Sequence, residues 1–463
     1  MKIIYFVFIF VISRDLVCAE SFPKDDGYRG IWYPNQATDD EYHFKYSGGF
    51  ATYPQQQEPI AIYVKKVNKT FFCYGGSVRG KQELLHMVSY YDHTTGMFPR
   101  PTILLDKKTN DAHDNPTMAI DDDGYIWIFS SAHGTLRSAY IHRSTKPYNI
   151  DDFERVVETN FSYTQPWYIS GRGFLFLHTR YQGEGPNLQL STRSLYWMTS
   201  KDGRSWSVPQ LLSRFEMGHY QISLHQGERV ITVFNYHPSP VGLNARTNLY
   251  YLETSDMGHT WKNIKGKIIV PPLISVYNEA LVRDYRSEHL LVYLKDLQLD
   301  AEGHPVILYL TSRGWQPGPA SDPRIFWVAR WTGKRWQYHQ VTTTDANYDY
   351  GAFYIEPDGL WRIFATSDPG PYPWGTGGEI VMWTSRDKGV TWLSSKVTSG
   401  SKLNNSYPRR PVDAQPQFYA LWADGNPLKP SDSSLYFTNK EGTGVWKLPT
   451  AMSADFEKPQ RIR

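Results

Sequence analysis

Two histidines, His113 and His133, stand at the two ends of one predicted β-hairpin. Between them lie a strand that runs to Ile120, a tight turn at 121–124, and a second strand that closes in the small-residue loop carrying His133. Antiparallel strands joined by a short turn bring the start of the first beside the end of the second, so both imidazoles are expected at one end. Such a pair suits acid–base chemistry, and two ordinary loop histidines are the alternative.

A sheet must position these histidines, because the surrounding sequence consists of strands. Turn residues separate short apolar runs, and no segment with helical periodicity extends beyond about two turns. The fold class is therefore all-β. Aromatic strands recur at intervals of about fifty to sixty residues, with one longer interval. They lie at 136–141, 194–200, 248–255, 325–330, 379–385 and 434–438.

Three of these strands run into a similar turn, at 200–206, 254–261 and 385–392. The last two match the Asp-box pattern S/T-x-D-x-G-x-T-W, and the first is one residue short. In such a turn the aspartate accepts backbone N–H bonds, the glycine takes a positive φ, and the tryptophan packs under the loop. Recurrence at the spacing of one blade predicts a β-propeller. The motif is structural and does not identify the chemistry.

The strand order predicts a seven-bladed β-propeller with Asp-box turns, with six or eight blades as alternatives. The first blade is built from 59–64, 69–74, 84–91 and 101–105. The middle strands of the other blades are 124–131, 173–179, 229–235, 289–294, 360–366 and 417–422. The inner strands begin near His113, Tyr163, His219, Tyr277, Tyr348 and Tyr407. Inner strands of a propeller begin around a central channel, so their first residues converge at one mouth.

The residues expected at this mouth are rich in histidine, tyrosine and arginine and poor in paired carboxylates. They are His113, Asn115, His133, Tyr163, His178, Arg180, Tyr181, His219, Tyr236, His237, Tyr277, Asn278, Lys295, Asp296, Tyr348, Asp368, Tyr407, Arg409 and Arg410. A glycosidase needs two carboxyl groups that flank the scissile bond, and Glu279 is the only glutamate at a predicted mouth position. Three aspartates, Asp296, Asp349 and Asp368, could supply such carboxyl groups, so a hydrolase is possible but not favoured. A weak metal signal comes from His219, His225 and His237.

This residue set suits the β-elimination of a uronic-acid glycoside. The proton to be removed lies next to a carboxylate and is too weakly acidic until that negative charge is neutralised. Arginine or a protonated histidine can neutralise it through charge-assisted hydrogen bonds. A neutral histidine or an activated tyrosine then takes the proton, and a tyrosine hydroxyl can protonate the leaving oxygen. No cofactor is required.

Five motifs lie among the predicted strands: His113-Asp-Asn-Pro, Ser-Ser-Ala-His133-Gly, Leu177-His-Thr-Arg-Tyr181, Arg193-Ser-Leu-Tyr and Phe234-Asn-Tyr236-His-Pro. Together they resemble the seven-bladed ulvan lyases, which are secreted polysaccharide lyases of marine bacteria. As a fold, the resemblance covers the chain from Gly27 to the C-terminus, whereas the specific motifs are confined to residues 110–240.

The resemblance implies roles for individual residues. Arg193 would neutralise the uronate carboxylate, and Tyr236 matches a later tyrosine of the family's site. The family's other tyrosine, a proposed acid/base, falls near 177–181, where both His178 and Tyr181 are available. The expected catalytic residues are His113, His133, Tyr181, Arg193 and Tyr236. The expected substrate-binding residues are Asn115, His178, Arg180, His237, Tyr277 and Arg410.

Structural roles are the alternatives for several of these side chains. Arg193 opens an aromatic strand, as Arg137 and Arg246 do in neighbouring blades, so it could cap a blade. Tyr181 and Tyr236 are two of the 33 tyrosines in the chain, so each could instead be a packing residue. Arg410 could contact sulfate groups or form a salt bridge in the blade that closes the ring.

The sequence therefore predicts a lyase that cleaves a sulfated, uronate-containing polysaccharide such as ulvan and leaves an unsaturated uronic acid end. Alternatives are a sialidase-like exo-glycosidase, because Asp boxes are common there, and a non-catalytic carbohydrate-binding propeller. Catalysis needs no cofactor, and the sequence leaves a structural metal ion open. A zinc site of the kind found in some ulvan lyases has no evident place, because the mature chain keeps one cysteine.

The N-terminus reads as a cleavable signal. An apolar run at 3–12 follows Lys2, and 17–19 has the small-residue pattern of a cleavage site. We expect a signal peptide at 1–19 and a single β-propeller catalytic domain at 20–463, secreted or periplasmic. Acylation at Cys18, as in a lipoprotein, is the alternative. The apolar run is too short to span a bilayer.

Composition narrows the partners. The chain has 463 residues and a formal net charge of +3 on 95 charged residues, with no run of lysine or arginine. Nucleic acid is therefore an unfavourable partner, and an anionic polysaccharide bound in a local basic cleft fits better. Signal removal leaves only Cys73, so packing rather than disulfides must stabilise the domain. We expect a monomer.

Overall fold

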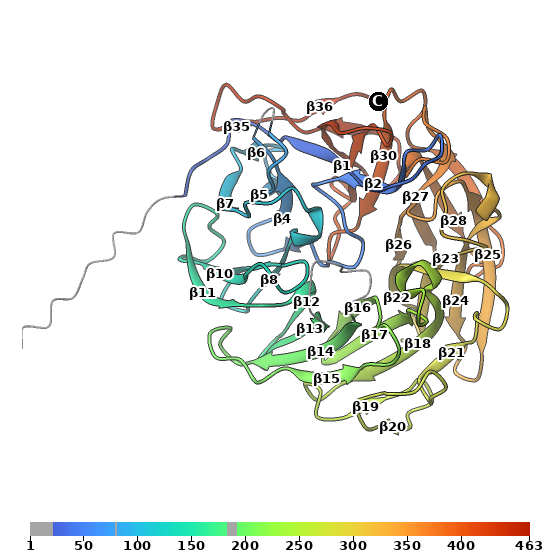
Figure 1. Ribbon diagram of the computed structural model, residues 1–463. Helices are drawn as coiled ribbons and strands as arrows, with labels where there is room; N and C mark the ends of the chain where they lie inside the picture. Colours follow the sequence, from blue (N-terminus) through green and yellow to red (C-terminus); the bar gives the residue numbers. More distant parts are fainter. Residues whose placement is uncertain (1–21, 79–80, 183–191) are drawn as a thin grey trace, which may run out of the picture.

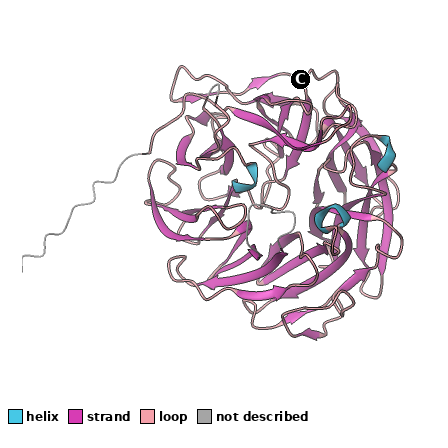
Figure 2. Ribbon diagram, viewed as in Figure 1, coloured by secondary structure: helices cyan, strands magenta, loops and turns pink. Residues whose placement is uncertain are grey.

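The structure is a computed structural model that describes residues 22–78, 81–182 and 192–463. The predicted signal at 1–19 lies outside these residues. Sheets follow one another around a common centre, so the fold is all-β and propeller-like (Figure 1). Helical structure in the described part is limited to three 3₁₀ turns, drawn cyan in Figure 2. They are η1 (Ala112–Asp114), η2 (Gly242–Ala245) and η3 (Pro319–Ser321).

The repeated unit is a sheet of antiparallel strands that are consecutive in the chain. One sheet contains β3 (Ala61–Val64), β4 (Lys69–Gly76), β5 (Leu85–Asp92) and β7 (Thr102–Asp106). The next contains β8 (Pro116–Ile120), β9 (Ile126–Ser130), β10 (Ala139–Ser144) and β11 (Phe153–Thr159). It is followed by β12 (Ser162–Ile169), β13 (Gly173–Gln182), β14 (Thr192–Ser200) and β15 (Gln210–Ser213).

The pattern continues through the second half of the chain. Another sheet contains β16 (Gln221–Gln226), β17 (Arg229–Tyr236), β18 (Thr247–Thr254), β19 (Trp261–Lys262) and β20 (Ile268–Ile269). The following one contains β22 (Leu291–Leu299), β23 (Pro305–Ser312), β24 (Arg324–Trp331) and β25 (Trp336–Thr344). Then come β26 (Gly351–Ile355), β27 (Trp361–Pro369), β28 (Gly378–Ser385) and β29 (Leu393–Lys396).

The last group of strands brings both ends of the chain together. It contains β30 (Asn404–Arg409), β31 (Ala420–Gly425), β33 (Leu435–Thr438), β34 (Val445–Lys447) and β36 (Gln460–Arg461). A single residue pair, Gly378 with Asn405, links this group to β28. The N-terminal hairpin of β1 (Gly30–Ala37) and β2 (Phe44–Gly49) pairs with β32 (Ser431–Ser433). Near the other end, β35 (Phe456–Glu457) pairs with β6 (Phe98–Pro99).

Aromatic rings fill the space between neighbouring sheets. Trp127 of β9 contacts Phe174 of β13 with ring centroids 5.1 Å apart, and Tyr91 of β5 contacts Phe418 at 5.4 Å. Such pairs contribute roughly 0.5–1.5 kcal/mol each beyond the area they bury. The high aromatic content expected to form the core therefore holds adjacent sheets together.

The predicted hairpin that carries the histidine pair is confirmed. β8 and β9 pair in antiparallel register from Pro116 with Ser130 to Ile120 with Ile126. The four strands predicted for the first sheet are also confirmed.

The inner strand predicted near Tyr277 is wrong. The innermost strand of that sheet is β22, and the run 289–294 contributes to it rather than to the middle strand. The middle strand is β23, a run that is buried along its whole length and belongs to no predicted strand of the repeat. Residues 281–283 form β21 (Leu281–Arg283), which is added to β18 of the preceding sheet. A two-sided apolar strand fits the interior better than the polar segment around Tyr277, which lies outside.

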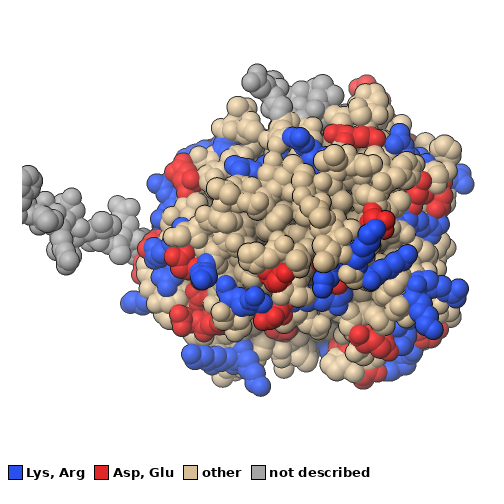
Figure 3. Space-filling model, turned by 90° about the horizontal axis from the view of Figure 1, so that it is seen from below, with Lys and Arg blue, Asp and Glu red and all other residues tan. Residues whose placement is uncertain are grey.

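The outer wall of the ring carries charges of both signs. On the face shown in Figure 3, basic and acidic side chains are interspersed among uncharged ones. None of the helices among residues 22–78, 81–182 and 192–463 is long and apolar enough to cross a membrane.

Candidate active site

A cavity of about 280 Å³ lies where the inner ends of several sheets meet the N-terminal hairpin. It is lined by Asn35, Gln36, Tyr46, Tyr53, Gln55, Gln56, Asp111, His113, His133, Tyr163, Arg193, Tyr220, Leu243, Arg246 and Tyr348. Apart from Leu243, every one of these side chains is polar. A polar, enclosed lining suits a saccharide more than an apolar ligand.

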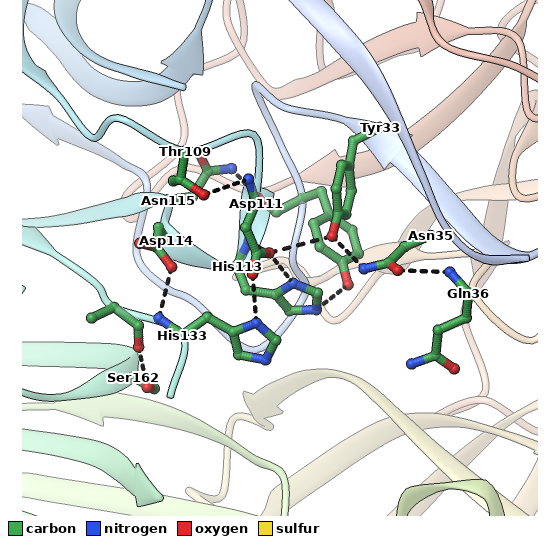
Figure 4. A network of polar contacts seen from close by, with 12 residues as sticks. Tyr33, Asn35, Gln36, Thr109, Asp111, His113, Asp114, Asn115, His133 and Ser162 are labelled. Carbon is green, nitrogen blue, oxygen red and sulfur yellow. Dashed lines mark hydrogen bonds and ion pairs between the residues drawn. The ribbon is translucent and has the colours of Figure 1, made fainter. Parts of the chain in front are cut away.

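Asp111 holds both histidines of the predicted pair (Figure 4). It caps η1, and its Oδ1 accepts a hydrogen bond from His113 Nδ1 at 2.6 Å and from the His113 backbone N–H at 3.1 Å. Its Oδ2 accepts from His133 Nδ1 at 2.7 Å. The two imidazole rings stack with centroids 4.1 Å apart and planes 18° from parallel. One carboxylate therefore fixes the orientation of both rings.

Asp111 remains a carboxylate although it is largely shielded from solvent. Burial alone would raise the pKa of Asp111, but His133 and His113 together hold it well below its ordinary value. Arg137 adds a further contact, with Nη2 3.1 Å from Asp111 Oδ2, and pairs with Asp114 through Nε at 2.7 Å. Because the carboxylate can only accept, each imidazole places its proton on Nδ1 and leaves Nε2 as an acceptor.

The two Nε2 atoms have different surroundings. His113 Nε2 lies 2.7 Å from the hydroxyl of Tyr53, which donates to it. Within the part of the chain that the structure describes, His133 Nε2 has no hydrogen-bond partner, and the ring borders the cavity. The pKa of His113 is lowered by burial and by His133, against the opposing effect of Asp111. His133 is therefore the imidazole placed to take a proton from a ligand.

Three tyrosines form the adjoining wall. The hydroxyls of Tyr163 and Tyr220 lie 3.3 Å apart, and Tyr181 donates to Tyr163 at 3.4 Å. Burial raises the pKa of Tyr181 to about 12, more than Arg193 lowers it, and raises that of Tyr163 well above its ordinary value. The phenols of Tyr163 and Tyr181 are therefore protonated near neutral pH and can donate hydrogen bonds.

Tyr163 has an unusual backbone conformation. Its φ is +48°, in the left-handed region that residues with bulky side chains seldom adopt, and a register shift between Ser162 and Gln165 interrupts its strand pairing. Bulges of this kind redirect side chains near functional sites. The irregularity turns the Tyr163 ring into the cavity.

Arg193 joins this wall from the start of β14. Its Nε donates to the hydroxyl of Tyr181 at 3.2 Å, and its guanidinium lies 5.0 Å from the Tyr181 ring centroid. The backbone is fixed as well, because the Arg193 N–H donates to the Met217 carbonyl and its carbonyl accepts from His219. A buried cation on a rigid strand thus faces the cavity beside the tyrosines.

The structure brings some of the predicted catalytic residues together. His113, His133 and Arg193 line the cavity, and Tyr181 lies directly behind, with its ring centroid 5.5 Å from that of His133. The structure does not bring Tyr236 to the cavity lining. Tyr236 packs against Phe215, and its hydroxyl accepts a hydrogen bond from Arg286 at 2.8 Å.

The predicted substrate-binding residues all lie outside the lining of the cavity. Asn115 is buried and donates to the carbonyls of Phe50 and Tyr53, so it holds the loop that carries Tyr53. His237 is buried behind the wall, 4.8 Å from the ring of Tyr220. Arg410 pairs with Asp296, at 3.3 Å.

The remaining three predicted binding residues are more distant in the fold. His178 is buried between the rings of Phe176 and Tyr196. Arg180 lies over the ring of Tyr196 at 6.0 Å. Tyr277 is 66% exposed and borders a separate surface groove, because the strand predicted there does not form.

Sequence reasoning gave no role to several residues of the site. Asp111 stands two residues before His113, and this Asp-x-His spacing was a usable signal for a carboxylate that orients an imidazole. Arg246 was read as a repeat residue, and Tyr163 only as a member of the mouth. Nothing in the sequence around Tyr53 pointed to the site, since that residue belongs to the segment before the first sheet.

Two groups of side chains could hold a metal ion by their spacing. Asp111, His113 and His133 each offer a ligand atom within 4.8 Å of the others, and so do Asp300, Glu302 and His304. In the first group, hydrogen bonds between the same atoms and the contact with Arg137 already satisfy the carboxylate. In the second, Arg330 pairs with both acidic groups.

Buried neutral histidines should make the protein sensitive to acid. Burial lowers the pKa of His178 and of His219 to about 3. The unfolded chain binds protons below about 6.5 and the folded chain does not, so stability is full above that pH and falls as pH drops toward 3. At pH 5 each such histidine should lower the free energy of unfolding by about 2 kcal/mol relative to neutral pH.

Urea unfolding at pH 7.5 and pH 5 measures this effect. Between pH 7.5 and pH 5 the free energy of unfolding should fall by about 2 kcal/mol less in His178→Asn than in wild type. His259→Asn, a change at an exposed histidine, is the matched control and should behave like wild type. An equal acid loss in His178→Asn and wild type would contradict the prediction.

Comparisons with known proteins agree with this architecture. A family model described as BNR repeat-containing family member matches residues 81–344, more than half of the chain. An "Ulvan lyase" of Alteromonas sp. (strain LOR) is 24% identical over 444 residues, covering 86% of this chain and 85% of that protein. The "Ulvan Lyase-PL25" of Pseudoalteromonas sp. (strain PLSV) is 24% identical over 453 residues, covering 86% of each.

Solved structures show the same fold. "Structure of a new family of Polysaccharide lyase PL25-Ulvanlyase" matches with a TM-score of 0.68 and 18% identity, covering 90% of this chain and 96% of that one. A second structure of that enzyme, bound to -[GlcA(1-4)Rha3S]-, matches with a TM-score of 0.67 over the same shares.

Proposed function

The chain belongs to the BNR repeat-containing family, and from this premise and the geometry of its cavity we propose that it is a polysaccharide lyase. Its substrate would be ulvan or a closely related sulfated polymer that contains uronic acid. The reaction would be a β-elimination that leaves an unsaturated uronic acid at the new end. Relatives named ulvan lyases, and a similar structure bound to a sulfated glucuronate-rhamnose fragment, support this substrate class.

One observation carries the proposal. A histidine whose Nε2 acceptor borders the cavity, a buried arginine and protonated tyrosines surround one polar space. These are the three components that the elimination needs: a base, a cation for the carboxylate and an acid for the leaving oxygen.

The steps follow from these positions. Arg193 binds the carboxylate and offsets the negative charge that builds up when the neighbouring C5 loses its proton. His133 Nε2 takes that proton, and Asp111 stabilises the imidazolium that forms. The electron pair forms the C4–C5 double bond as the C4–O bond breaks, and the Tyr163 hydroxyl gives its proton to the departing oxygen. No cofactor takes part.

Hydrolysis by a carboxylate pair fits the cavity less well. Among the described residues, Asp111 is the only acidic group in the lining, and both of its oxygens already accept hydrogen bonds. A glycosidase needs one carboxyl as acid and another as nucleophile or base. The lining therefore favours elimination over the sialidase-like alternative.

Ultraviolet absorbance of the new double bond, which is conjugated to the carboxylate, tests the proposal. Purified protein should produce a rise with ulvan, and the products should carry an unsaturated end by mass spectrometry. Saturated products would show a hydrolase. Binding without chain shortening across a panel of polyuronates would show a carbohydrate-binding propeller.

The proposal extends to the domain as a whole. We infer one catalytic domain at 20–463, a seven-bladed propeller with Asp-box turns, secreted or periplasmic after loss of 1–19 and active as a monomer. The order of the strand groups supports the blade count. Asp256 and Asp387 accept from the backbone N–H groups of Thr260 and Thr391 at 2.9 Å each, as an Asp box requires.

Replacing Tyr163 with phenylalanine tests the acid. Removal of the hydroxyl should lower kcat by about 10²-fold, because the leaving oxygen loses its proton donor. The loss should shrink when the leaving group is an easily expelled phenol. Tyr236→Phe is the comparison, since that tyrosine corresponds to one of the ulvan lyase family's site. A larger loss at Tyr236 than at Tyr163 would return the role to Tyr236.

A further inference from the structure

Arg246 lines the cavity without an acidic partner. It is 2% exposed, and it donates hydrogen bonds to the Leu243 carbonyl at 2.8 Å and to the Tyr348 hydroxyl at 3.0 Å. Its guanidinium lies 4.5 Å from the Tyr293 ring centroid and 5.1 Å from that of Tyr220. Among the residues that the structure describes, the groups in contact with this buried cation are therefore neutral.

Lys45 stands next to the same part of the cavity. It is 5% exposed, and its Nζ donates to Gln36 at 3.0 Å and to Asn244, both neutral amides. Burial, followed by the charges of Arg246 and Arg193, lowers the pKa of Lys45 well below its ordinary value. Over residues 22–78, 81–182 and 192–463, no carboxylate lies within ion-pair distance of Lys45 or Arg246.

Four buried cations elsewhere in the described chain do have such partners: Lys107 pairs with Asp114, Arg324 with Asp322, Arg330 with Asp300 and Arg362 with Glu356. Two others, Lys295 and Arg409, donate to amide and carbonyl oxygens instead, but neither lines the cavity. Burying a charge without a counter-charge is costly, and the chain carries this cost at the wall of its central cavity. An anionic ligand placed there would offset it.

Arg246 is linked to the histidine pair through two intervening tyrosine rings on either path along the wall. One way around, the ring centroid of His133 is 6.2 Å from Tyr163, whose ring is 5.1 Å from Tyr220, the neighbour of Arg246. The other way, His113 is 6.1 Å from Tyr46, which stacks at 4.7 Å on Tyr348, the second neighbour of Arg246. Arg193 is closer to the base, because it bonds Tyr181 beside His133. Both guanidinium groups flank the Tyr220 ring, Arg193 at 5.9 Å and Arg246 at 5.1 Å, but Arg193 is the one bonded to Tyr181 beside His133.

We propose that Arg246, with Lys45 behind Gln36, forms a second anion subsite that binds the sulfate ester on the sugar next to the uronate. This rests on the proposed function, in which Arg193 binds the uronate carboxylate. A guanidinium matches the oxygens of a sulfate with two parallel hydrogen bonds, and the lysine adds a further hydrogen-bond donor. A second carboxylate of the polymer shares this chemistry, and the experiment separates the two sources.

Equilibrium binding separates the subsite from catalysis. Oligosaccharides of ulvan, native or chemically desulfated, are titrated into protein carrying His133→Ala, which prevents turnover. The native ligand should bind about tenfold more tightly than the desulfated one. Adding Arg246→Gln should bring this ratio close to one, and Arg246→Lys should keep part of it. Adding Lys45→Gln should lower the ratio about threefold, which tests the subsite even where Arg246→Gln does not fold.

Two substitutions on the outer surface are matched controls. Arg155 lies 5.4 Å from the ring centroid of Tyr140, and Lys66 lies 5.5 Å from that of Tyr148. Arg155→Gln and Lys66→Gln repeat the loss of a cation from an aromatic ring without touching the cavity. Both should leave the ratio unchanged.

The outcomes distinguish this inference from the proposed function. Equal affinity for native and desulfated ligands would overturn the subsite, even if the wild-type protein is an active lyase. Equal losses of affinity for both ligands in Arg246→Gln would assign the residue to a carboxylate and also overturn the proposal. A sulfate-dependent affinity that requires Arg246, in a protein that releases no unsaturated product, would support the subsite and refute the lyase.

Discussion

Replacing His133 with alanine should lower kcat on ulvan by about 10²–10⁴-fold, the usual contribution of a general base. Among the residues that the structure describes, His133 is the one of the pair whose Nε2 has no hydrogen-bond partner. His113 already uses its Nε2 to accept from Tyr53. Initial rates of double-bond formation, followed by ultraviolet absorbance, measure the effect.

Two further variants make this prediction specific. His113→Ala should lower kcat less than His133→Ala does, because the His113 ring supports His133 and does not take the proton. Asp111→Asn should lower kcat as well, because an amide can no longer fix both Nδ1 protons and stabilise the imidazolium. Circular dichroism and thermal unfolding check that each variant is folded. Comparable activity of His133→Ala and wild type would end the assignment.

Replacing Arg193 with alanine should lower kcat/KM by about 10²–10³-fold, the scale seen when one group that stabilises a developing charge is lost. The carboxylate of the substrate must be neutralised before the adjacent carbon becomes acidic enough to lose its proton. Arg193→Lys should recover part of the activity, because the charge remains while the bidentate geometry is lost.

The substrate provides the internal control for Arg193. A methyl-esterified uronate carries no negative charge at this position, so the loss caused by Arg193→Ala should be several-fold smaller on the ester than on the free acid. Arg155→Gln, at an exposed arginine, should behave like wild type on both. An unchanged ratio between the two substrates in Arg193→Ala would instead indicate that Arg193 has a structural role in its strand.

The fold was largely readable from the chain because its units are local. Alternation, turn residues and recurring aromatic strands identify sheets whose strands are consecutive in sequence, and hairpin pairing depends on neighbouring residues. The wrong prediction of an inner strand near Tyr277 also arose from this reliance on local alternation. Residues 305–310 form a continuous apolar run, and because such a run shows no alternation, its periodicity does not distinguish a buried strand from other buried segments.

Assignments that depend on which way a side chain points were less secure. Tyr236 ends β17, one residue beyond the predicted strand 229–235, and its ring packs against Phe215 while its hydroxyl bonds Arg286, so it does not line the cavity. A shift of one residue along a strand moves a side chain to the other face, and a motif alone does not fix that choice.

The sequence by itself determined the all-β class, the hairpin and the meeting of His113 with His133, because these follow from short-range pairing. Only the tertiary structure decided that Asp111 bonds both imidazoles, that the Tyr53 hydroxyl donates to His113 Nε2, and that Tyr163 and Arg246 line the cavity. These residues come from separate sheets and from the segment before the first sheet. They converge only when the ring of sheets closes, and that closure depends on packing between segments far apart in the chain.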